Sequence, residues 1–364
     1  MRELTLSELE TIVSEVGEAR YRARQVMHWL WRHQASSLEE MREVPARLRQ
    51  YLAQNYRLGH LTVSHVAHAA DGTRKLLFRL ADGAGIEGVI IPTHDRTTLC
   101  ISSQVGCAMA CEFCATARMG LVRNLKASEI LGQIIAASTQ CTQAERLTNY
   151  VFMGMGEPLA NYPNLARALT VMTAEWGLAV SPRRITVSTV GLAPVMERLL
   201  AEFPVNLAVS LHATSDELRN QLVPINRRYP LAHLLESCRQ LPLGHRRRIT
   251  FEYVMLQGVN DSPADAVRLA RLVAPLKCKI NLIFFNPFPG APFQPTPRSR
   301  IEEFQAILLS RNLTATIRES RGAEIAAACG QLYAQARMPR SRLTGLNHCP
   351  SPSDTRETQP PTLL

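Results

Sequence analysis

The features that would place this chain in a membrane or outside the cell are missing from its 364 residues. No apolar run is long enough to cross a membrane, and residues 1–10 are acidic and polar, unlike a signal peptide. The nine cysteines are irregularly spaced and follow no secretory leader, which favours reduced thiols over a disulfide framework. No internal repeat of fixed period is visible. We therefore expect a cytoplasmic protein with no membrane association.

The composition that is present suits a large folded core and a polyanionic partner. Apolar residues make up 46% of the chain, so one big α/β domain with a smaller appendage is the natural partition. Lys and Arg number 41 against 31 Asp and Glu, a formal charge of +10. This excess favours nucleic acid as the partner, although many basic proteins bind none.

The local pattern changes along the chain and predicts four segments. Residues 1–58 read as a helical accessory domain, and residues 59–96 as a β-rich bridge with Asp-Gly turns at 71–72 and 82–83. Residues 97–336 alternate strands with helices, and residues 337–364 are rich in Pro, Ser, Thr and Arg, which is typical of a disordered tail. Alternation predicts parallel strands with right-handed crossovers. About six strands are counted, two short of a closed barrel, so the fold class is α/β with an open, partial (β/α)6 barrel.

Three cysteines with the spacing Cys107-x3-Cys111-x2-Cys114 follow the first strand of this predicted barrel. Electron-transfer clusters usually take four cysteine thiolates, so three would leave one iron open to another ligand. Zinc is the rival metal, but the common structural zinc signatures need a fourth Cys or His at matching spacing, and none lies close by. Three buried thiols without a metal are the remaining alternative. The spacing favours an iron-sulfur centre that does chemistry.

Polar residues follow the carboxyl ends of the later predicted strands, where a barrel carries its active site. Each alone would suit a turn or a helix cap, but together with the cysteine loop they predict one shared site. Glu157 would hold an ammonium group, and Ser188, Ser210 and Asn286 would bind hydroxyl or carboxylate oxygens. Such groups suit an amino-acid nucleoside.

Several long segments carry a closer resemblance, in an order that is specific to one family. They are residues 100–114 (CISSQVGCAMACEFC), 153–159 (MGMGEPL), 210–213 (SLHA), 286–290 (NPFPG) and 321–332 (RGAEIAAACGQL). The sequence resembles the dual-specificity 23S rRNA/tRNA adenine-C2 methyltransferases of the radical S-adenosylmethionine (SAM) superfamily. The resemblance runs from about residue 20 to about residue 336.

This resemblance implies the cofactors and the residues that bind them. One [4Fe-4S] cluster would be held by Cys107, Cys111 and Cys114, with SAM on the open iron. The residues that would bind SAM are Gly156, Glu157, Ser188, Ser210, Leu211, His212 and Asn286. The barrel would then be a radical SAM barrel with a small N-terminal helical domain.

The resemblance also implies a radical route, which adenine C2 needs because this aromatic carbon is a poor nucleophile. Cys329 would take a methyl group from a first SAM, and the 5′-deoxyadenosyl radical from a second SAM would activate that S-methyl group. Cys100 would resolve the protein–RNA link and leave a Cys100–Cys329 disulfide to be reduced. Glu87 would be the proton acceptor. Without the motifs, Cys329 and Cys100 would read as packing residues, whereas Glu87 interrupts an apolar strand, where an unpaired carboxylate is costly.

The expected partners are 23S rRNA, tRNA and a flavodoxin-like electron donor, and the protein is expected to be a monomer. Phosphate contacts would come from basic groups near the barrel mouth. The candidates are Arg118, Arg123, Lys126, Arg183, Arg184, Arg227, Arg228 and Arg246–Arg248. Two alternatives stay open: methylation at adenine C8 or of only one RNA class, and a non-catalytic iron-sulfur protein that binds RNA or senses redox state.

Overall fold

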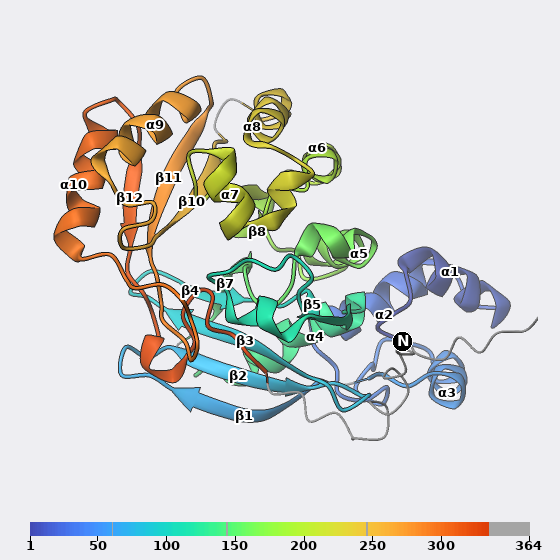
Figure 1. Ribbon diagram of the computed structural model, residues 1–364. Coiled ribbons are helices and arrows are strands. Elements are labelled where there is room, and N and C mark those ends of the chain that lie inside the picture. Colours follow the sequence, from blue (N-terminus) through green and yellow to red (C-terminus); the bar gives the residue numbers. More distant parts are fainter. Residues whose placement is uncertain (60, 143–144, 245–246, 335–364) are drawn as a thin grey trace, which may run out of the picture.

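The computed structural model describes residues 1–59, 61–142, 145–244 and 247–334, and the predicted tail at 337–364 lies outside this range. Three short helices form the N-terminal part, as predicted: α1 (Leu6–Glu15), α2 (Tyr21–Trp31) and α3 (Ala46–Asn55). Thr5 begins α1 with a capping box, in which its hydroxyl accepts from the Glu8 N–H at 3.2 Å and the Glu8 carboxylate accepts from the Thr5 N–H at 2.6 Å. These helices lie at one end of the molecule, beside α4 and α5 (Figure 1).

A single ten-stranded sheet forms the body of the described chain. Its first strands pair antiparallel in sequence order: β1 (Thr62–His68), β2 (Arg74–Arg79), β3 (Gly85–Pro92) and β4 (Thr97–Cys100). From β4 onward every pairing is parallel. The parallel strands that follow are β7 (Leu147–Phe152), β8 (Ile185–Thr189), β9 (Asn206–Ser210), β10 (Ile249–Met255), β11 (Cys278–Phe284) and β12 (Ala315–Arg318). The β-rich segment is therefore continuous with the barrel sheet.

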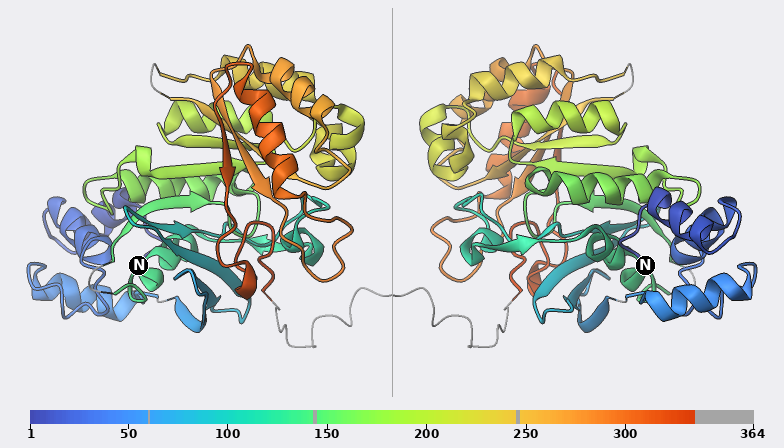
Figure 2. Two further views of the ribbon diagram at one scale, coloured as in Figure 1. Left: turned by 90° about the vertical axis from the view of Figure 1, so that its left-hand side faces the viewer. Right: turned by 90° about the vertical axis from the view of Figure 1, so that its right-hand side faces the viewer.

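Helices alternate with the parallel strands and lie along the outside of the curved sheet (Figure 2). They are α4 (Ala127–Ser138), α5 (Tyr162–Thr173), α6 (Ala193–Glu202), α7 (Asp216–Leu222), α8 (Leu231–Gln240), α9 (Pro263–Val273) and α10 (Arg298–Leu309). All seven residues of β10 are buried, as expected for a strand covered on both faces. None of the described helices is long and apolar enough to span a membrane.

The open, partial α/β barrel is confirmed, with one more parallel strand than predicted. In the strand order, β1 and β12 are the two edges of the described sheet. The additional strand β12 has only four residues, two of them exposed, so it carries too little apolar signal to be recognised in the sequence. A separate hairpin of β5 (Gln104–Gly106) and β6 (Leu121–Asn124) also went unpredicted, and it encloses the cysteine loop.

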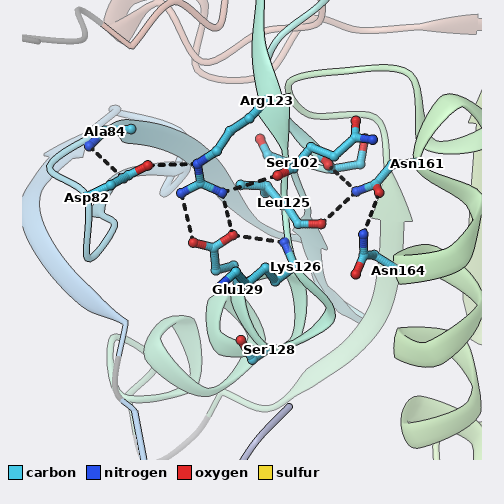
Figure 3. Close-up of polar contacts among 12 residues, drawn as sticks. Asp82, Ala84, Ser102, Arg123, Leu125, Lys126, Ser128, Glu129, Asn161 and Asn164 are labelled. Atoms are coloured by element: carbon cyan, nitrogen blue, oxygen red, sulfur yellow. Dashed lines mark hydrogen bonds and ion pairs between the residues drawn. The ribbon is translucent and has the colours of Figure 1, made fainter. Parts of the chain in front are cut away.

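Arg123 on β6 ties this hairpin to two other elements (Figure 3). Its Nε donates to Asp82 in the β2–β3 turn at 2.7 Å, and its terminal nitrogens donate to both oxygens of Glu129 on α4 at 2.8 and 2.9 Å. The carboxylates raise the pKa of Arg123 further, Glu129 most. The guanidinium is bound on both edges by protein carboxylates, so Arg123 is engaged within the protein, and its pairing with RNA phosphate stays a prediction.

Replacing Arg123 with Met should lower the free energy of unfolding by about 1–2 kcal/mol, because the partly buried Glu129 carboxylate and the more exposed Asp82 carboxylate both lose their partner. Chemical denaturation followed by circular dichroism measures this loss. Arg239→Met is the matched control, since the Arg239–Glu236 pair is about half exposed on α8 and should contribute little. Equal stability of the two variants would contradict the assigned role of Arg123.

Candidate active site

One pocket opens at the edge of the sheet where the parallel strands end. Its lining includes the three cysteines of the loop, both further cysteines of the predicted chemistry, and most of the predicted binding residues. These are Cys100, Cys107, Cys111, Cys114, Gly156, Glu157, Ser188, Ser210, His212, Asn286 and Cys329. Leu211 and Glu87 are not part of this lining. Residues from positions 100 to 329 thus meet at one place, as the strand-end argument predicted.

The cysteine loop is held by backbone hydrogen bonds on both sides. The Cys107 N–H donates to the Gly120 carbonyl at 2.9 Å, and the Ala115 N–H donates to the Gly330 carbonyl at 2.7 Å. Gly106 permits the close approach, since its φ is +74° and a Cβ there would lie 1.8 Å from the Gly120 oxygen. The loop is therefore held in position by hydrogen bonds to its neighbours and by this close approach.

The three thiols are free and placed in a setting that suits metal ligation. Burial raises the pKa of all three, that of Cys107 to about 12, so each thiolate would need a nearby cation. Within the described ranges, no three His, Cys, Asp or Glu side chains gather as the ligands of a single metal ion would. A polynuclear cluster takes its thiolates on different irons, and three thiols around one pocket, one buried and two partly buried, fit that requirement.

Glu157 follows β7 and is fixed by the protein. Its carboxylate accepts from the Leu159 N–H at 3.0 Å and from the Val190 N–H at 2.9 Å. Burial raises its pKa to about 7. Gly156 leads into this residue with a φ of +97°, and a Cβ there would lie 2.5 Å from the Gln104 side chain. Glu157 therefore joins the ends of β7 and β8 while facing the pocket.

His212 lies just beyond β9 in a left-handed conformation, with a φ of +58°. Its Nδ1 accepts from the Val254 N–H at 3.0 Å, so the ring proton sits on Nε2. Burial lowers its pKa to about 3, which keeps the ring neutral. The ring packs edge-on against Phe113 of the cysteine loop, with 4.6 Å between centroids. The neighbouring Leu211 side chain is fully buried in the core.

Arg219 on α7 is a buried residue that sequence reasoning missed. Its guanidinium donates to the carbonyls of Val190, Ser210 and Leu211 at 2.8–3.0 Å, and to Asn226 Oδ1 at 2.9 Å. Burial lowers its pKa to about 10. One side chain thus fixes the carboxyl ends of β8 and β9, which carry Ser188 and Ser210. A lone arginine in a polar helix gave no signal of this in the sequence.

Cys329 and Cys100 face the same pocket from different parts of the chain. Cys100 ends β4 and is buried, and burial, then the nearby Cys329, raises its pKa to about 12. Cys329 remains exposed, and its carbonyl accepts from Asn286 Nδ2 at 3.3 Å. The backbone after Cys329 also contacts the cysteine loop, since Thr116 Oγ1 donates to the Leu332 carbonyl at 2.6 Å.

Glu87 on β3 lies behind the segment that carries Cys329. Its carboxylate accepts from the Tyr333 N–H at 2.9 Å and pairs with Lys75 at 3.2 Å. In the β3–β4 register Val89 lies opposite Cys100, so Glu87, two residues from Val89, projects from the same face of the sheet as Cys100. The Glu87 carboxylate, which interrupts this apolar strand, is therefore paired, and the pairing offsets the cost of burying its charge.

Glu252 lines the pocket from the middle of β10, and sequence reasoning missed it as well. It interrupts the apolar strand ITFEYVM in the way that Glu87 interrupts β3, so the same signal would have found it. Burial raises its pKa, while Arg318 and a hydrogen bond from Asn281 favour its charged form.

An open α/β barrel with a three-cysteine loop and polar groups around one pocket at the carboxyl edge defines a radical SAM protein. A model of the radical SAM superfamily matches residues 101–270, and one of the N-terminal domain of ribosomal RNA large subunit methyltransferases matches residues 1–58. The dual-specificity RNA methyltransferase RlmN of Geobacter sulfurreducens is 52% identical over 90% of each chain. The RlmN of Anaeromyxobacter sp. is 48% identical over 100% of this chain and 94% of its own.

A solved structure agrees with these sequence relatives. The crystal structure of a radical SAM methyltransferase from Sphaerobacter thermophilus is 49% identical, with a TM-score of 0.87 over 92% of this chain and 99% of that one. The chain belongs to the family of dual-specificity RNA methyltransferases RlmN.

Replacing Gly106 with Ala should remove most of the iron and sulfide from protein purified without oxygen, because the added Cβ forces the Cys107 backbone away from Gly120. Iron and sulfide per chain are the readout. Gly258→Ala is the control: Gly258 has a similar φ of +69° but nothing within 4 Å of an added Cβ. Equal metal content in both variants would show that this close approach does not shape the loop.

Proposed function

We propose that this protein methylates C2 of adenosine in 23S rRNA and tRNA, with Cys329 as the carrier of the methyl group. The observation that carries the proposal is the meeting of Cys329 and Cys100 with the three-cysteine loop around one pocket. The family supports the same chemistry, since its members are named dual-specificity RNA methyltransferases.

Cys107, Cys111 and Cys114 would hold one [4Fe-4S] cluster, with SAM at its open iron. When bound, this cofactor supplies one-electron cleavage of SAM and so the hydrogen abstraction that adenine C2 chemistry requires. Gly156, Ser188, Ser210, His212 and Asn286 line the surrounding wall and would bind SAM. Glu157, held by two backbone N–H groups, also lines this wall and would bind SAM. Leu211, whose side chain is held in the core, stays a predicted SAM-binding residue.

Cys329 suits the role of carrier because its side chain is accessible inside the pocket while its backbone is anchored to Asn286. After its thiol loses a proton, the Cys329 sulfur would form a bond to the methyl carbon of SAM while the bond from that carbon to the sulfonium breaks, and S-adenosylhomocysteine would leave. The Cys100 thiolate would later attack the Cys329 sulfur, so that an S–S bond forms and the S–CH2 bond to the RNA breaks. The electron pair would go to the methylene carbon, which takes up a proton to become the methyl group. The resulting Cys100–Cys329 disulfide would be reduced by an external dithiol or enzyme. Glu87 would accept the proton that leaves C2, and its bond to Tyr333 ties it to the segment carrying Cys329.

Among the basic candidates, the structure favours those that follow the strand ends. Arg227 and Arg228 are exposed in the segment after β9 and α7, at the end of the molecule that carries the pocket. Arg183, Arg184, Arg247 and Arg248 precede β8 and β10 and so lie at the opposite edge of the sheet, and Arg246 lies outside the described residues. Arg118 donates to the Gly290 carbonyl and stays exposed, as does Lys126. The remaining proposals are a flavodoxin-like electron donor, a cytoplasmic location and a monomeric state.

The proposed function is tested by nucleoside mass spectrometry after anaerobic reconstitution with SAM, a reductant, and 23S rRNA or tRNA. We expect 2-methyladenosine in both RNAs. Detection of 8-methyladenosine would support methylation at adenine C8 instead. Product in only one of the two RNAs would support an enzyme that acts on a single RNA class. Absence of both product and 5′-deoxyadenosine would contradict an enzymatic role.

Replacing Cys329 with Ala should abolish RNA methylation and leave the iron and sulfide content unchanged, because this cysteine is not among the three loop thiols. Nucleoside mass spectrometry and metal analysis measure the two effects. Cys278→Ala is the control, since Cys278 is buried at the start of β11, at the opposite edge from the pocket. Methylation retained by the Cys329 variant would refute the carrier.

Replacing Cys100 with Ala should trap RNA on the protein, because the step that resolves the covalent link loses its thiol. We expect a nuclease-sensitive mass increase on Cys329 in protein purified from cells. Normal turnover by protein free of bound RNA would contradict this role.

A further inference from the structure

Lys75 on β2 is the one cation among the described residues that pairs with the buried Glu87 carboxylate. Its Nζ lies 3.2 Å from Glu87 Oε1, and the side chains of Lys75 and Glu87 are only 18% and 8% exposed. The other oxygen, Glu87 Oε2, accepts from the Tyr333 N–H at 2.9 Å. A pair that is shielded from water interacts more strongly than a surface pair, so the carboxylate is fixed from two sides.

The strand register places this pair beside Cys100. Lys75 lies opposite Val89 in the β2–β3 pairing, and Cys100 lies opposite Val89 in the β3–β4 pairing. Residues opposite each other project from the same face of the sheet, and Glu87 is two residues from Val89. Lys75, Glu87 and Cys100 therefore share one face. The segment that carries the proposed methyl carrier covers this face, since Tyr333 of that segment donates to Glu87.

The same ammonium also holds the chain just before Cys329. Lys75 Nζ donates to the Ala326 carbonyl at 3.3 Å. Ala326 follows the short helix η5 (Ala323–Ile325) with a φ of +52°, a left-handed conformation that is costly for a non-glycine residue unless its surroundings hold it. An ammonium has three donors, so Lys75 can bind the Glu87 carboxylate and this carbonyl together. It thus joins the proposed proton acceptor to the turn that leads to the proposed methyl carrier.

The other basic side chains of β2 are engaged elsewhere. Arg74 is buried and pairs with Glu145 at 2.8 Å. Arg79 is exposed and donates to the Gly83 carbonyl at 2.9 Å. Of the three basic residues in this strand, only Lys75 is paired with the proposed proton acceptor.

We propose that Lys75 is a positioning residue for the removal of the proton from adenine C2. This inference rests on the proposed function, in which the C2–H bond breaks, its electron pair stays in the purine ring, and the proton goes to a Glu87 oxygen. A carboxylate can accept about four hydrogen bonds, so those from Lys75 and Tyr333 leave room for that proton. Lys75 sets the placement of Glu87 relative to the segment that carries Cys329, because it is hydrogen-bonded to both.

Single-turnover methylation tests this inference, with reconstituted protein whose Cys329 already carries a methyl group and RNA that carries protium or deuterium at adenine C2. Lys75→Met should form methylated adenosine on the order of tenfold to a hundredfold more slowly, as expected for a displaced proton acceptor. The rate ratio between protium and deuterium RNA should rise above that of wild type, because breaking the C2–H bond becomes slower. Formation of 5′-deoxyadenosine should stay unchanged, since it precedes that step. Lys75→Arg should restore most of the rate, because it keeps a cation near both partners.

Arg79→Met is the matched control, since it removes an exposed cation from the same strand and should behave as wild type. A Lys75→Met protein with the wild-type rate and isotope effect would overturn the inference and leave the proposed function intact. Slow methylation with a wild-type isotope effect and no recovery by Lys75→Arg would show a purely structural role and overturn it as well. Wild-type rates from Glu87→Gln would instead overturn the proton-acceptor role within the proposed function.

Discussion

The site of this protein depends on one geometric constraint: parallel strands bring their carboxyl ends to a single edge of the sheet. Within the ten-stranded sheet every pairing from β4 to β12 is parallel, so residues separated by more than two hundred positions in the chain meet at one pocket. The cysteine loop follows β4, Glu157 follows β7, Ser188 and Ser210 lie at the ends of β8 and β9, and Asn286 follows β11. Arg219 and Glu157 then fix these ends to one another through backbone carbonyls and N–H groups.

The segment after β12 closes the site, because it returns across the pocket and bonds to three separate regions. Gly330 and Leu332 accept from the cysteine loop, Cys329 accepts from Asn286, and the Tyr333 N–H donates to Glu87. Further bonds join this segment to the β1–β2 turn, where Asp71 accepts from the Gly322 N–H. The position of Cys329 is thus coupled to the groups proposed to hold the cofactor and to accept a proton.

The sequence alone predicted the pocket residues that belong to short, local patterns. The spacing of Cys107, Cys111 and Cys114 and the polar residues after each strand are short patterns, and strand–helix alternation predicts that they converge. It could not predict contacts that depend on partners from other elements: nothing in the sequence shows that Asp82 and Glu129 bind Arg123 on either side. Arg219 was missed because only the fold reveals what it contacts, whereas Glu252 was overlooked although it interrupts an apolar strand as Glu87 does. The strand β12 was missed because four residues carry too little periodicity.

The central claim is that three thiols of one loop hold an iron-sulfur cluster whose open iron binds SAM. Electron paramagnetic resonance of the reduced protein, with and without SAM labelled with nitrogen-15 at its amine, tests it most directly. We predict a spectrum that changes when SAM is added and a hyperfine coupling from the labelled nitrogen. A cluster signal that is indifferent to SAM, or one that survives replacement of all three cysteines, would contradict the account.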